Sequence, residues 1–320
     1  MTKVKKIALE EHFMTPGFQA YSKAFTQHID PAVFAELGRR LADFDEDRLA
    51  EMDRAGIDIT VLSQTGPGVQ GESDAGLAVA RARESNDFLA AQIARHPTRF
   101  AGFAALPMHD PEQAARELER AVRELGFKGS LVNGHTHGRY YDDPAYDAFW
   151  ARMQELDVPM YLHPTDAFIQ PQVLAGHPEL TGAAWGWGVE TASHALRLLF
   201  GGVFDRFPRL KLILGHMGEG LPYQRWRFDS RFAVYSHGVR LERAPSEYIG
   251  TNIVITTSGV CSHGALAGAI AELGAQAVMF SVDYPYESTE VAAKFIEDAP
   301  LDDTTRALVC HGNAQRLLKL

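Results

Sequence analysis

Short apolar runs alternate with longer amphipathic stretches along most of the chain. The first apolar run, residues 4–13, closes on Glu10, Glu11 and His12. From Asp45 onwards the alternation is regular, because each stretch with apolar residues at helical spacing leads into a short run rich in β-branched residues. This pattern predicts eight units in which a strand is followed by a helix.

Helix-capping residues and glycines mark the boundaries of these units. Asp110 followed by Pro111 is typical of a helix start, and Gly126 is typical of a helix end. The predicted strands are residues 4–13, 57–63, 100–106, 128–132, 158–163, 210–214, 253–257 and 277–282. The predicted helices are residues 46–55, 76–96, 111–125, 145–156, 190–204, 221–235, 265–273, 288–298 and 303–318.

Nearly continuous apolar strands bounded by helices are typical of parallel strands that are buried on both faces. Eight of them predict a closed (β/α)8 TIM barrel, and the chain length fits one such domain over residues 1–320. Two long segments interrupt the rhythm, residues 14–43 after the first strand and residues 164–188 after the fifth. We expect both to be insertions near the carboxyl ends of their strands.

Composition and charge narrow the choice of partners and compartment. The chain has 31 basic and 41 acidic residues, a formal charge of -10, and no basic run with interleaved aromatic residues. Nucleic acid and anionic membrane surfaces are therefore not expected as partners. Cys261 and Cys310 form no Cys-x-x-Cys pattern, and no apolar stretch is long enough to span a membrane, so we expect a cytoplasmic protein.

Polar residues stand where the predicted strands end, which is where a barrel of this type carries its active site. Glu10 and His12 lie two positions apart and therefore share one face of the first strand. A carboxylate and an imidazole are ligand types of Zn²⁺ and Mn²⁺. The other strand ends offer Asn133, His163, His216, Thr257, Ser258 and Asp283.

These residues lie in motifs that are spread over nearly the whole chain. The motifs are A-L-E-E-H-F from Ala8, F-A-A-L-P from Phe103, L-D-V-P-M-Y-L-H-P from Leu156, I-L-G-H-M-G-E-G-L-P from Ile213, T-T-S-G from Thr256 and F-S-V-D-Y-P-Y-E from Phe280. Together they resemble the amidohydrolase superfamily. Within it, the resemblance is to the non-oxidative aromatic-acid decarboxylases typified by γ-resorcylate and 2,3-dihydroxybenzoate decarboxylases.

The resemblance implies a set of ligands and catalytic groups. Its metal ligands would be Glu10, His12, His163 and Asp283, holding one divalent ion, Zn²⁺ or Mn²⁺, with no organic cofactor. Asp283 would give a proton to the substrate ring, with His216 orienting or relaying that proton and Glu219 behind it. Arg227, Asn133, Trp187 and Tyr284 would contact the substrate. A homodimer or homotetramer is expected from the family.

The implied reaction is the decarboxylation of a hydroxylated benzoate, reversible as a carboxylation. This chemistry requires the carboxylate to be held, the ring to be polarised through its hydroxyl, and a proton to be delivered to the carbon that bears the carboxylate. The alternative is a metal-dependent hydrolase of a lactone, ester or amide, in which the ion activates water. A third reading is a barrel that binds a ligand without turnover, against which the full ligand set argues.

Several residues have a second interpretation. His163 and His216 are alternatively hydrogen-bonded core histidines, Asp283 a turn residue, and Arg227 a surface ion-pair partner. His135 and His137 form a His-x-His pair, but glycines flank it in a loop, so a metal role is not expected.

This chain differs from many hydrolases of the superfamily in the residue type at the first ligand position and in the place of the lysine on the fourth predicted strand. Glu10 stands where many of those relatives carry histidine, so the four predicted ligands sum to zero charge with a divalent ion. We infer that this favours chelation of an anionic substrate over the activation of water. Lys128 lies at the start of the fourth predicted strand, the wrong end for the bridging carbamate of a binuclear site.

Overall fold

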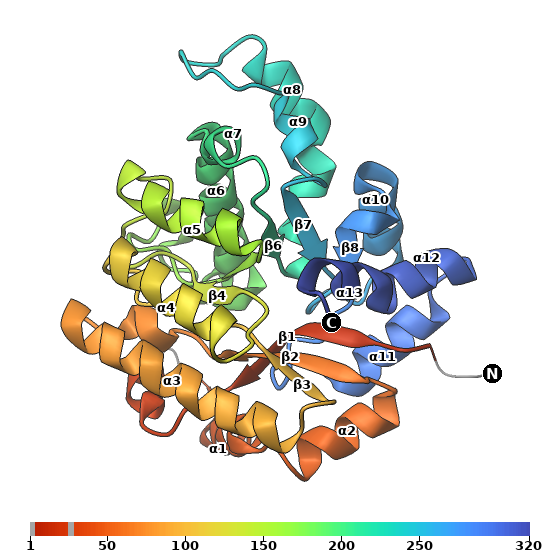
Figure 1. Cartoon of the computed structure of the whole chain (residues 1–320). Helices are drawn as coiled ribbons and strands as arrows, with labels where there is room; N and C mark the ends of the chain where they lie inside the picture. The colour runs from red at the N-terminus through yellow and green to blue at the C-terminus, as the bar shows by residue number, and fades with distance from the viewer. Residues whose placement is uncertain (1–3, 25–28) are drawn as a thin grey trace.

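The computed structural model describes residues 4–24 and 29–320. Eight parallel strands form its centre and helices surround them (Figure 1). The strands are β1 Ile7–Phe13, β2 Ile59–Gln64, β3 Phe100–Gly102, β4 Ser130–Asn133, β5 Met160–His163, β6 Leu212–Leu214, β7 Ile253–Thr256 and β8 Val278–Met279. Every predicted strand therefore exists, although β3 and β8 are shorter than the apolar runs that contain them.

The strands close into a barrel. Two ladders run in chain order, β1-β2-β3 and β4-β5-β6-β7-β8. A bridge between Ala104 and Ser130 joins the first ladder to the second, and a bridge between Glu11 and Tyr284 joins the segment after β8 to β1. Together with solved structures of the same fold, described below, this closure confirms the predicted (β/α)8 barrel.

Helices follow the strands as the amphipathic pattern predicts. The principal ones are α2 Asp47–Ala55, α3 Ala75–Arg95, α4 Pro111–Arg123, α5 Asp147–Leu156, α6 Gly186–Phe200, α8 Arg225–Phe232, α10 His263–Leu273 and α11 Thr289–Asp298. The chain ends with α12 Asp303–Ala307, a π-helical turn Leu308–Gly312 and α13 Asn313–Leu318. α13 contacts β1, so the C-terminal helices lie beside the first strand (Figure 1).

The two insertions carry local structure that the sequence pattern did not predict. The first contains η1 Phe18–Ala24 and a helix, α1 Pro31–Ala42, which is capped by the Asp30 carboxylate. The second contains three short 3-10 turns between Gln172 and Ala184. α1 was missed because the prolines and glycine of this segment, Pro16, Gly17 and Pro31, indicated irregular structure. Most residues of α1 are exposed, and within it only Leu41 is buried.

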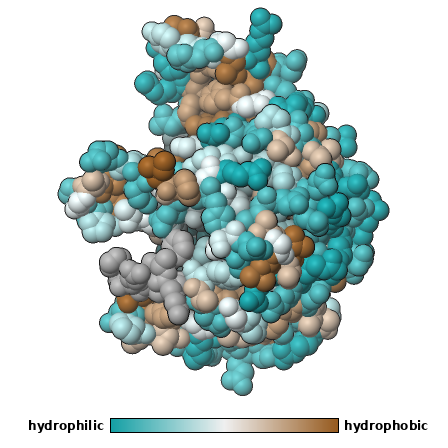
Figure 2. Space-filling model, turned by 90° about the vertical axis from the view of Figure 1, so that its left-hand side faces the viewer, coloured by the Kyte–Doolittle hydropathy of each residue, from teal (hydrophilic) through white to brown (hydrophobic). Residues whose placement is uncertain are grey.

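The helix predicted over residues 221–235 is shorter, and α8 projects from the barrel at the top of Figure 1. Large apolar side chains are exposed on and after it, since Trp226 is 79% exposed and Val234 and Tyr235 are each 62% exposed. Figure 2 shows brown, apolar surface on the projecting top of the molecule. Within the described residues, no helix is long and apolar enough to cross a membrane.

Candidate active site

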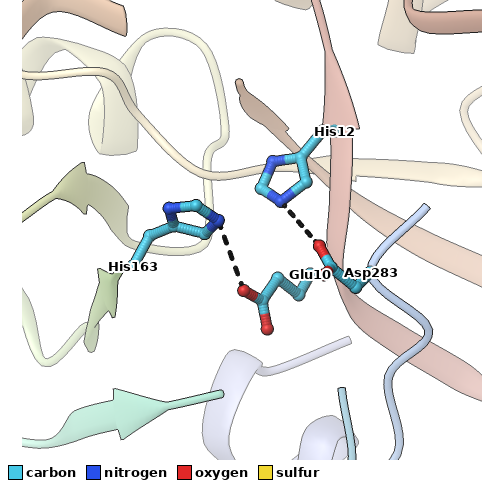
Figure 3. Close-up of side chains that lie close together, drawn as sticks. All are labelled: Glu10, His12, His163 and Asp283. Atoms are coloured by element: carbon cyan, nitrogen blue, oxygen red, sulfur yellow. Dashed lines mark ion pairs between the residues drawn. The ribbon is translucent and has the colours of Figure 1, made fainter. Parts of the chain in front are cut away.

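Four side chains from three parts of the barrel converge at the carboxyl ends of the strands (Figure 3). Glu10 and His12 lie on β1, His163 ends β5, and Asp283 follows β8. Each offers one ligand atom, and these atoms all lie within 4.8 Å of one another. His12 Nε2 is 3.2 Å from Asp283 Oδ1, and His163 Nε2 is 3.5 Å from Glu10 Oε1. The structure thus brings together all four predicted ligands.

The hydrogen bonds around the cluster leave its inward-facing atoms free. His163 Nδ1 donates to the carbonyl of Pro164 at 2.9 Å, which leaves the lone pair of Nε2 for the centre of the cluster. Glu10 Oε1, His12 Nε2 and Asp283 Oδ1 are buried and have no hydrogen-bond partner among the described residues. Unpartnered buried polar atoms of this kind are rare, and a divalent cation would satisfy all three at once.

Burial and neighbouring charges set the protonation of the ligands. Burial, together with the charge of His12, lowers the pKa of His163 to about 3, so this imidazole is neutral and free to bind a metal ion. Burial opposes ionisation of Asp283, but its close electrostatic contacts with His12 and His216 outweigh it and hold the pKa of this carboxyl below its ordinary value. The cluster therefore presents an imidazole lone pair and a carboxylate in the forms that bind cations.

Glu10 is held from behind by the interior of the barrel. The phenol of Tyr161, fully buried on β5, donates to Glu10 Oε2 and lies 2.8 Å from Thr256 Oγ1. Gly215, after β6, leaves room for this arrangement, because a Cβ there would stand 2.5 Å from Glu10 Oε2. One carboxylate oxygen is thus fixed by hydrogen bonding and the other faces the cluster.

His216 and Glu219 lie beside the cluster on the loop after β6. His216 Nε2 is 3.5 Å from Asp283 Oδ2, and His216 Nδ1 is 3.1 Å from Glu219 Oε1. Burial alone would lower the pKa of His216, but the charge of Glu10 and the bonds to Asp283 and Glu219 raise it well above its ordinary value. The three residues form a chain along which a proton can be held and passed.

The backbone of these residues is held in a sparsely populated conformation. Asp283 has a φ of 81°, and His216 and Glu219 have φ values of 50° and 52°. Non-glycine residues at positive φ are uncommon and cluster at functional sites. Gly259 makes room for His216, since a Cβ there would lie 2.9 Å from His216 Cδ2.

Comparison with known protein families gives one match over nearly the whole chain. Residues 12–320 match the model of the Amidohydrolase family. The chain belongs to the amidohydrolase family. It is 46% identical to a γ-resorcylate decarboxylase from Polaromonas sp. over 98% of each chain.

Two solved structures resemble this amidohydrolase closely. The crystal structure of a 2,6-dihydroxybenzoate decarboxylase complexed with 2,6-dihydroxybenzoate is 42% identical in sequence, covers 99% of this chain and 100% of its own, and gives a TM-score of 0.93. The crystal structure of a dihydroxybenzoic acid decarboxylase from Polaromonas sp. contains bound manganese and the inhibitor 2-nitroresorcinol. It is 45% identical in sequence, covers 99% of this chain and 97% of its own, and also gives a TM-score of 0.93. These relatives confirm the predicted branch of the superfamily.

The predicted substrate contacts of this amidohydrolase lie at different distances from the cluster. Asn133 pairs with His163 across β4 and β5 and is 4% exposed, and its buried Oδ1 has no hydrogen-bond partner in the part of the chain that the structure describes. Trp187 begins α6, and its indole donates to Asp166 at 2.7 Å. The adjacent Gly188 approaches Glu219 so closely that a Cβ there would lie 2.9 Å from Glu219 Oε2. Asn133 therefore stands next to His163, and the backbone next to Trp187 approaches Glu219.

The side chain of Tyr284 packs among arginines, and Arg227 lies on the exposed surface of α8. The Tyr284 ring packs between the guanidinium groups of Arg40 and Arg48, 4.5 Å and 4.3 Å from its centroid, and the residue is only 3% exposed. Arg227 is exposed on α8, and its side chain makes no hydrogen bond or ion pair within the described part of the chain. This packing leaves Tyr284 no face toward a substrate in this arrangement.

Tyr286 takes the position beside the cluster that was expected of Tyr284. Its ring centroid is 5.6 Å from that of His12, and its hydroxyl is 2.5 Å from Thr65 Oγ1. Tyr286 is 46% exposed as a whole residue, but burial around its hydroxyl raises the pKa of Tyr286 to about 12, so the phenol stays protonated. The sequence Asp283-Tyr-Pro-Tyr offered two tyrosines, and no periodic pattern decides which of them faces the site because the segment is not a strand.

The remaining candidates have other contacts. His135 Nε2 lies 3.1 Å from the carbonyl of Asp166, and His137 Nε2 lies 2.6 Å from the carbonyl of Glu72. Neither belongs to the four-residue cluster. Lys128 Nζ lies 3.5 Å from the carbonyl of Lys319, near the C-terminus, as expected for the opposite end of the barrel.

Proposed function

We propose that this chain catalyses the metal-dependent, non-oxidative decarboxylation of an ortho-hydroxylated benzoate, with 2,6-dihydroxybenzoate, also called γ-resorcylate, as the first candidate substrate. The observation that carries the proposal is the cluster itself, four ligand groups with unpartnered inward atoms next to a His216–Asp283 pair. The names of the relatives at 42% to 46% identity support the same substrate class.

The donor set fits one divalent cation. Glu10 Oε1, His12 Nε2, His163 Nε2 and Asp283 Oδ1 would hold it, and no organic cofactor is expected. When bound, the ion supplies positive charge that stabilises the substrate's carboxylate and neighbouring phenolate oxygen. Two carboxylates and two imidazoles suit Zn²⁺ as well as Mn²⁺. Manganese in the Polaromonas relative makes Mn²⁺ the first ion to test.

The protein's own groups deliver the proton. The carbon–carbon bond to the carboxylate breaks, carbon dioxide leaves, and the electron pair that remains on the ring takes up a proton at the same carbon. Asp283 is the proposed donor to this carbon. Because Asp283 rests as a carboxylate, it would first take this proton from protonated His216, whose Nε2 faces Asp283 Oδ2 at 3.5 Å. Glu219 accepts from His216 Nδ1 and fixes the orientation of the ring.

Three groups are proposed to recognise the aromatic substrate within this subunit. Asn133 offers a buried amide for a ring hydroxyl, Tyr286 offers aromatic surface beside His12, and Trp187 offers an aromatic ring at the start of α6. Tyr286 replaces Tyr284 in this role because its ring approaches His12 and is 46% exposed. The exposed position of Arg227 supports a contact to substrate only if assembly brings α8 to a site.

Exposed apolar side chains bear on assembly, and the two cysteines bear on location. The exposed apolar side chains on and after α8, together with Trp185 at 61% exposure, form surface of the kind that subunit contacts cover. We therefore expect a homodimer or homotetramer. A cytoplasmic location is expected because both cysteines are unpaired.

The test compares decarboxylation with hydrolysis. Purified protein supplied with Mn²⁺ is incubated with 2,6-dihydroxybenzoate, 2,3-dihydroxybenzoate, salicylate and 5-carboxyvanillate, and separately with a panel of lactones and esters. Release of carbon dioxide and the matching phenol supports the proposal. Hydrolysis without decarboxylation would favour the hydrolase alternative, which the relatives' names do not support.

Replacement of Asp283 tests the proton donor. Asp283→Asn keeps an oxygen ligand but cannot pass a proton, so turnover should fall by about 100-fold or more. Bound metal and activity are measured together, and Asp283→Asn protein that kept both the metal ion and full turnover would remove Asp283 from this role.

A further inference from the structure

The seam between β8 and β1 carries three of the four ligands but few strand hydrogen bonds. β8 ends at Met279, and the chain then runs beside β1 without forming a strand. Within the described residues, two backbone hydrogen bonds join this segment to β1 here, from Asp283 N to Glu10 O at 3.1 Å and from His12 N to Tyr284 O at 2.7 Å. The spacing of the ligands therefore needs other support.

Two buried side chains supply that support. Glu11 Oε1 accepts hydrogen bonds from the backbone N–H of Val282 at 3.0 Å and from the hydroxyl of Ser281 at 3.2 Å. Ser281 Oγ in turn accepts from the backbone N–H groups of Glu10 at 2.6 Å and Leu9 at 3.2 Å. A hydroxyl has one donor and two acceptor sites, so Ser281 is fully used. Side chains thus replace the missing ladder.

Glu11 lies behind the cluster and does not belong to it. Side chains alternate along a strand, so Glu11 points away from the face that Glu10 and His12 share. It is 1% exposed. Its bond to Val282 fixes the backbone immediately before Asp283, whose φ of 81° would otherwise be free to relax. Loss of this bond would change the distance between His12 and Asp283 without removing either ligand.

We propose that Glu11, acting with Ser281, is a positioning residue of the metal centre, which holds the β1 ligands and Asp283 at the spacing that binds the ion. The inference rests on the proposed metal site. Residues that orient metal ligands commonly change metal affinity by about 10- to 100-fold when they are replaced. Glu11 therefore acts on the affinity for the ion, and only through that on turnover.

The test measures how tightly the full-length, metal-loaded protein holds Mn²⁺ against a competing chelator. Glu11→Ala should raise the Kd for Mn²⁺ about 10- to 100-fold, whereas Glu11→Gln, which keeps an oxygen that accepts from Val282 and Ser281, should stay within about threefold of the parent. Unchanged affinity in Glu11→Ala, or equal loss in both variants, would overturn the proposal.

Glu117 provides the matched control. It is another buried glutamate, 3% exposed on α4, and it accepts from Asn86 at 2.8 Å and from Arg120. Glu117→Ala should lower the Tm and leave the Kd for Mn²⁺ unchanged. A loss of Mn²⁺ affinity in Glu117→Ala as large as that in Glu11→Ala would assign the effect to general destabilisation and contradict the proposal.

A second variant covers the case in which Glu11→Ala does not fold. Ser281→Ala removes the hydroxyl that joins Glu11 to the β1 backbone, and should raise the Kd for Mn²⁺ about tenfold; an unchanged Kd would count against the proposal. Mn²⁺ binding by the parent protein distinguishes failure of the proposed metal site from failure of the proposed role of Glu11. Parent protein that binds no Mn²⁺ would remove the metal site, whereas a tightly binding parent with unaffected variants would remove only the role of Glu11.

Discussion

Replacement of Gly215 by alanine should disable the site through a single methyl group. Gly215 has a φ of -70°, so alanine is compatible with its backbone. The added Cβ would stand 2.5 Å from Glu10 Oε2, about 0.9 Å short of the 3.4 Å at which ordinary contact begins, and 3.0 Å from the Tyr161 hydroxyl. Glu10 must therefore move, and both its hydrogen bond to Tyr161 and its place among the ligands move with it.

The size of the effect follows from this displacement. A shift of about 1 Å in a group that positions substrate commonly costs about 100-fold in rate, and overpacking of this kind costs about 1 to 3 kcal/mol of stability. We expect Gly215→Ala to fold, to bind Mn²⁺ at least about tenfold more weakly, and to lose about 100-fold in kcat/KM for decarboxylation.

The assay pairs chelator competition for Mn²⁺ with the rate of carbon dioxide release. Gly38→Ala serves as the control, because a Cβ at this position in α1 meets nothing within 4 Å. It should leave both quantities unchanged and raise stability by up to about 1 kcal/mol. Gly215→Ala protein with parental affinity and rate would refute the placement of Glu10 in the site.

Three further predictions concern Tyr161, Glu10 and His194. Tyr161→Phe removes the hydroxyl that donates to Glu10 Oε2. Chelator competition should show that this variant binds Mn²⁺ about tenfold more weakly. An affinity equal to that of the parent would count against a role for this hydrogen bond. Glu10→His makes the charge of the ligand set one unit more positive. Metal analysis should find that the variant retains the ion while its decarboxylation rate falls. An unchanged rate would contradict the inference that the charge of Glu10 favours chelation of an anionic substrate. Burial lowers the pKa of His194 to about 3, while the unfolded chain titrates near about 6.5 and binds the extra proton there. The contribution of His194 to the free energy of unfolding is therefore full above about pH 6.5 and falls below that pH by up to about 1.4 kcal/mol per pH unit. Urea unfolding of the parent and of His194→Gln, at neutral and at mildly acidic pH, measures this contribution. The free energy of unfolding should fall more steeply on acidification in the parent than in the variant.

The sequence predicted the barrel because its elements depend on local patterns, since apolar runs and helix caps placed all eight strands. Polar residues at strand ends marked a larger group of candidates, in which Glu10 and His12 share a face through simple alternation. The family resemblance selected the four ligands, which the structure brings together. The family resemblance then assigned the roles of Asp283, His216 and Glu219, which the structure brings into one chain of contacts.

What the sequence could not predict depends on irregular backbone. Tyr284 and Tyr286 lie on a segment without strand periodicity, so only the three-dimensional structure shows that one packs between arginines and the other beside His12. Tyr161 points into the barrel from a fully apolar run, where nothing distinguishes it from a packing residue. The role of Glu11 depends on the short β8, whose length the apolar run overstated.

We expect decarboxylation to require one divalent ion, held by Glu10, His12, His163 and Asp283. The most direct measurement titrates metal-stripped protein with Mn²⁺ and follows bound metal and carbon dioxide release from 2,6-dihydroxybenzoate in the same samples. The rate should rise in proportion to bound metal and level off at one ion per chain, and His163→Ala should neither bind Mn²⁺ tightly nor turn over. Full activity in the stripped protein, or in His163→Ala without bound metal, would contradict the account.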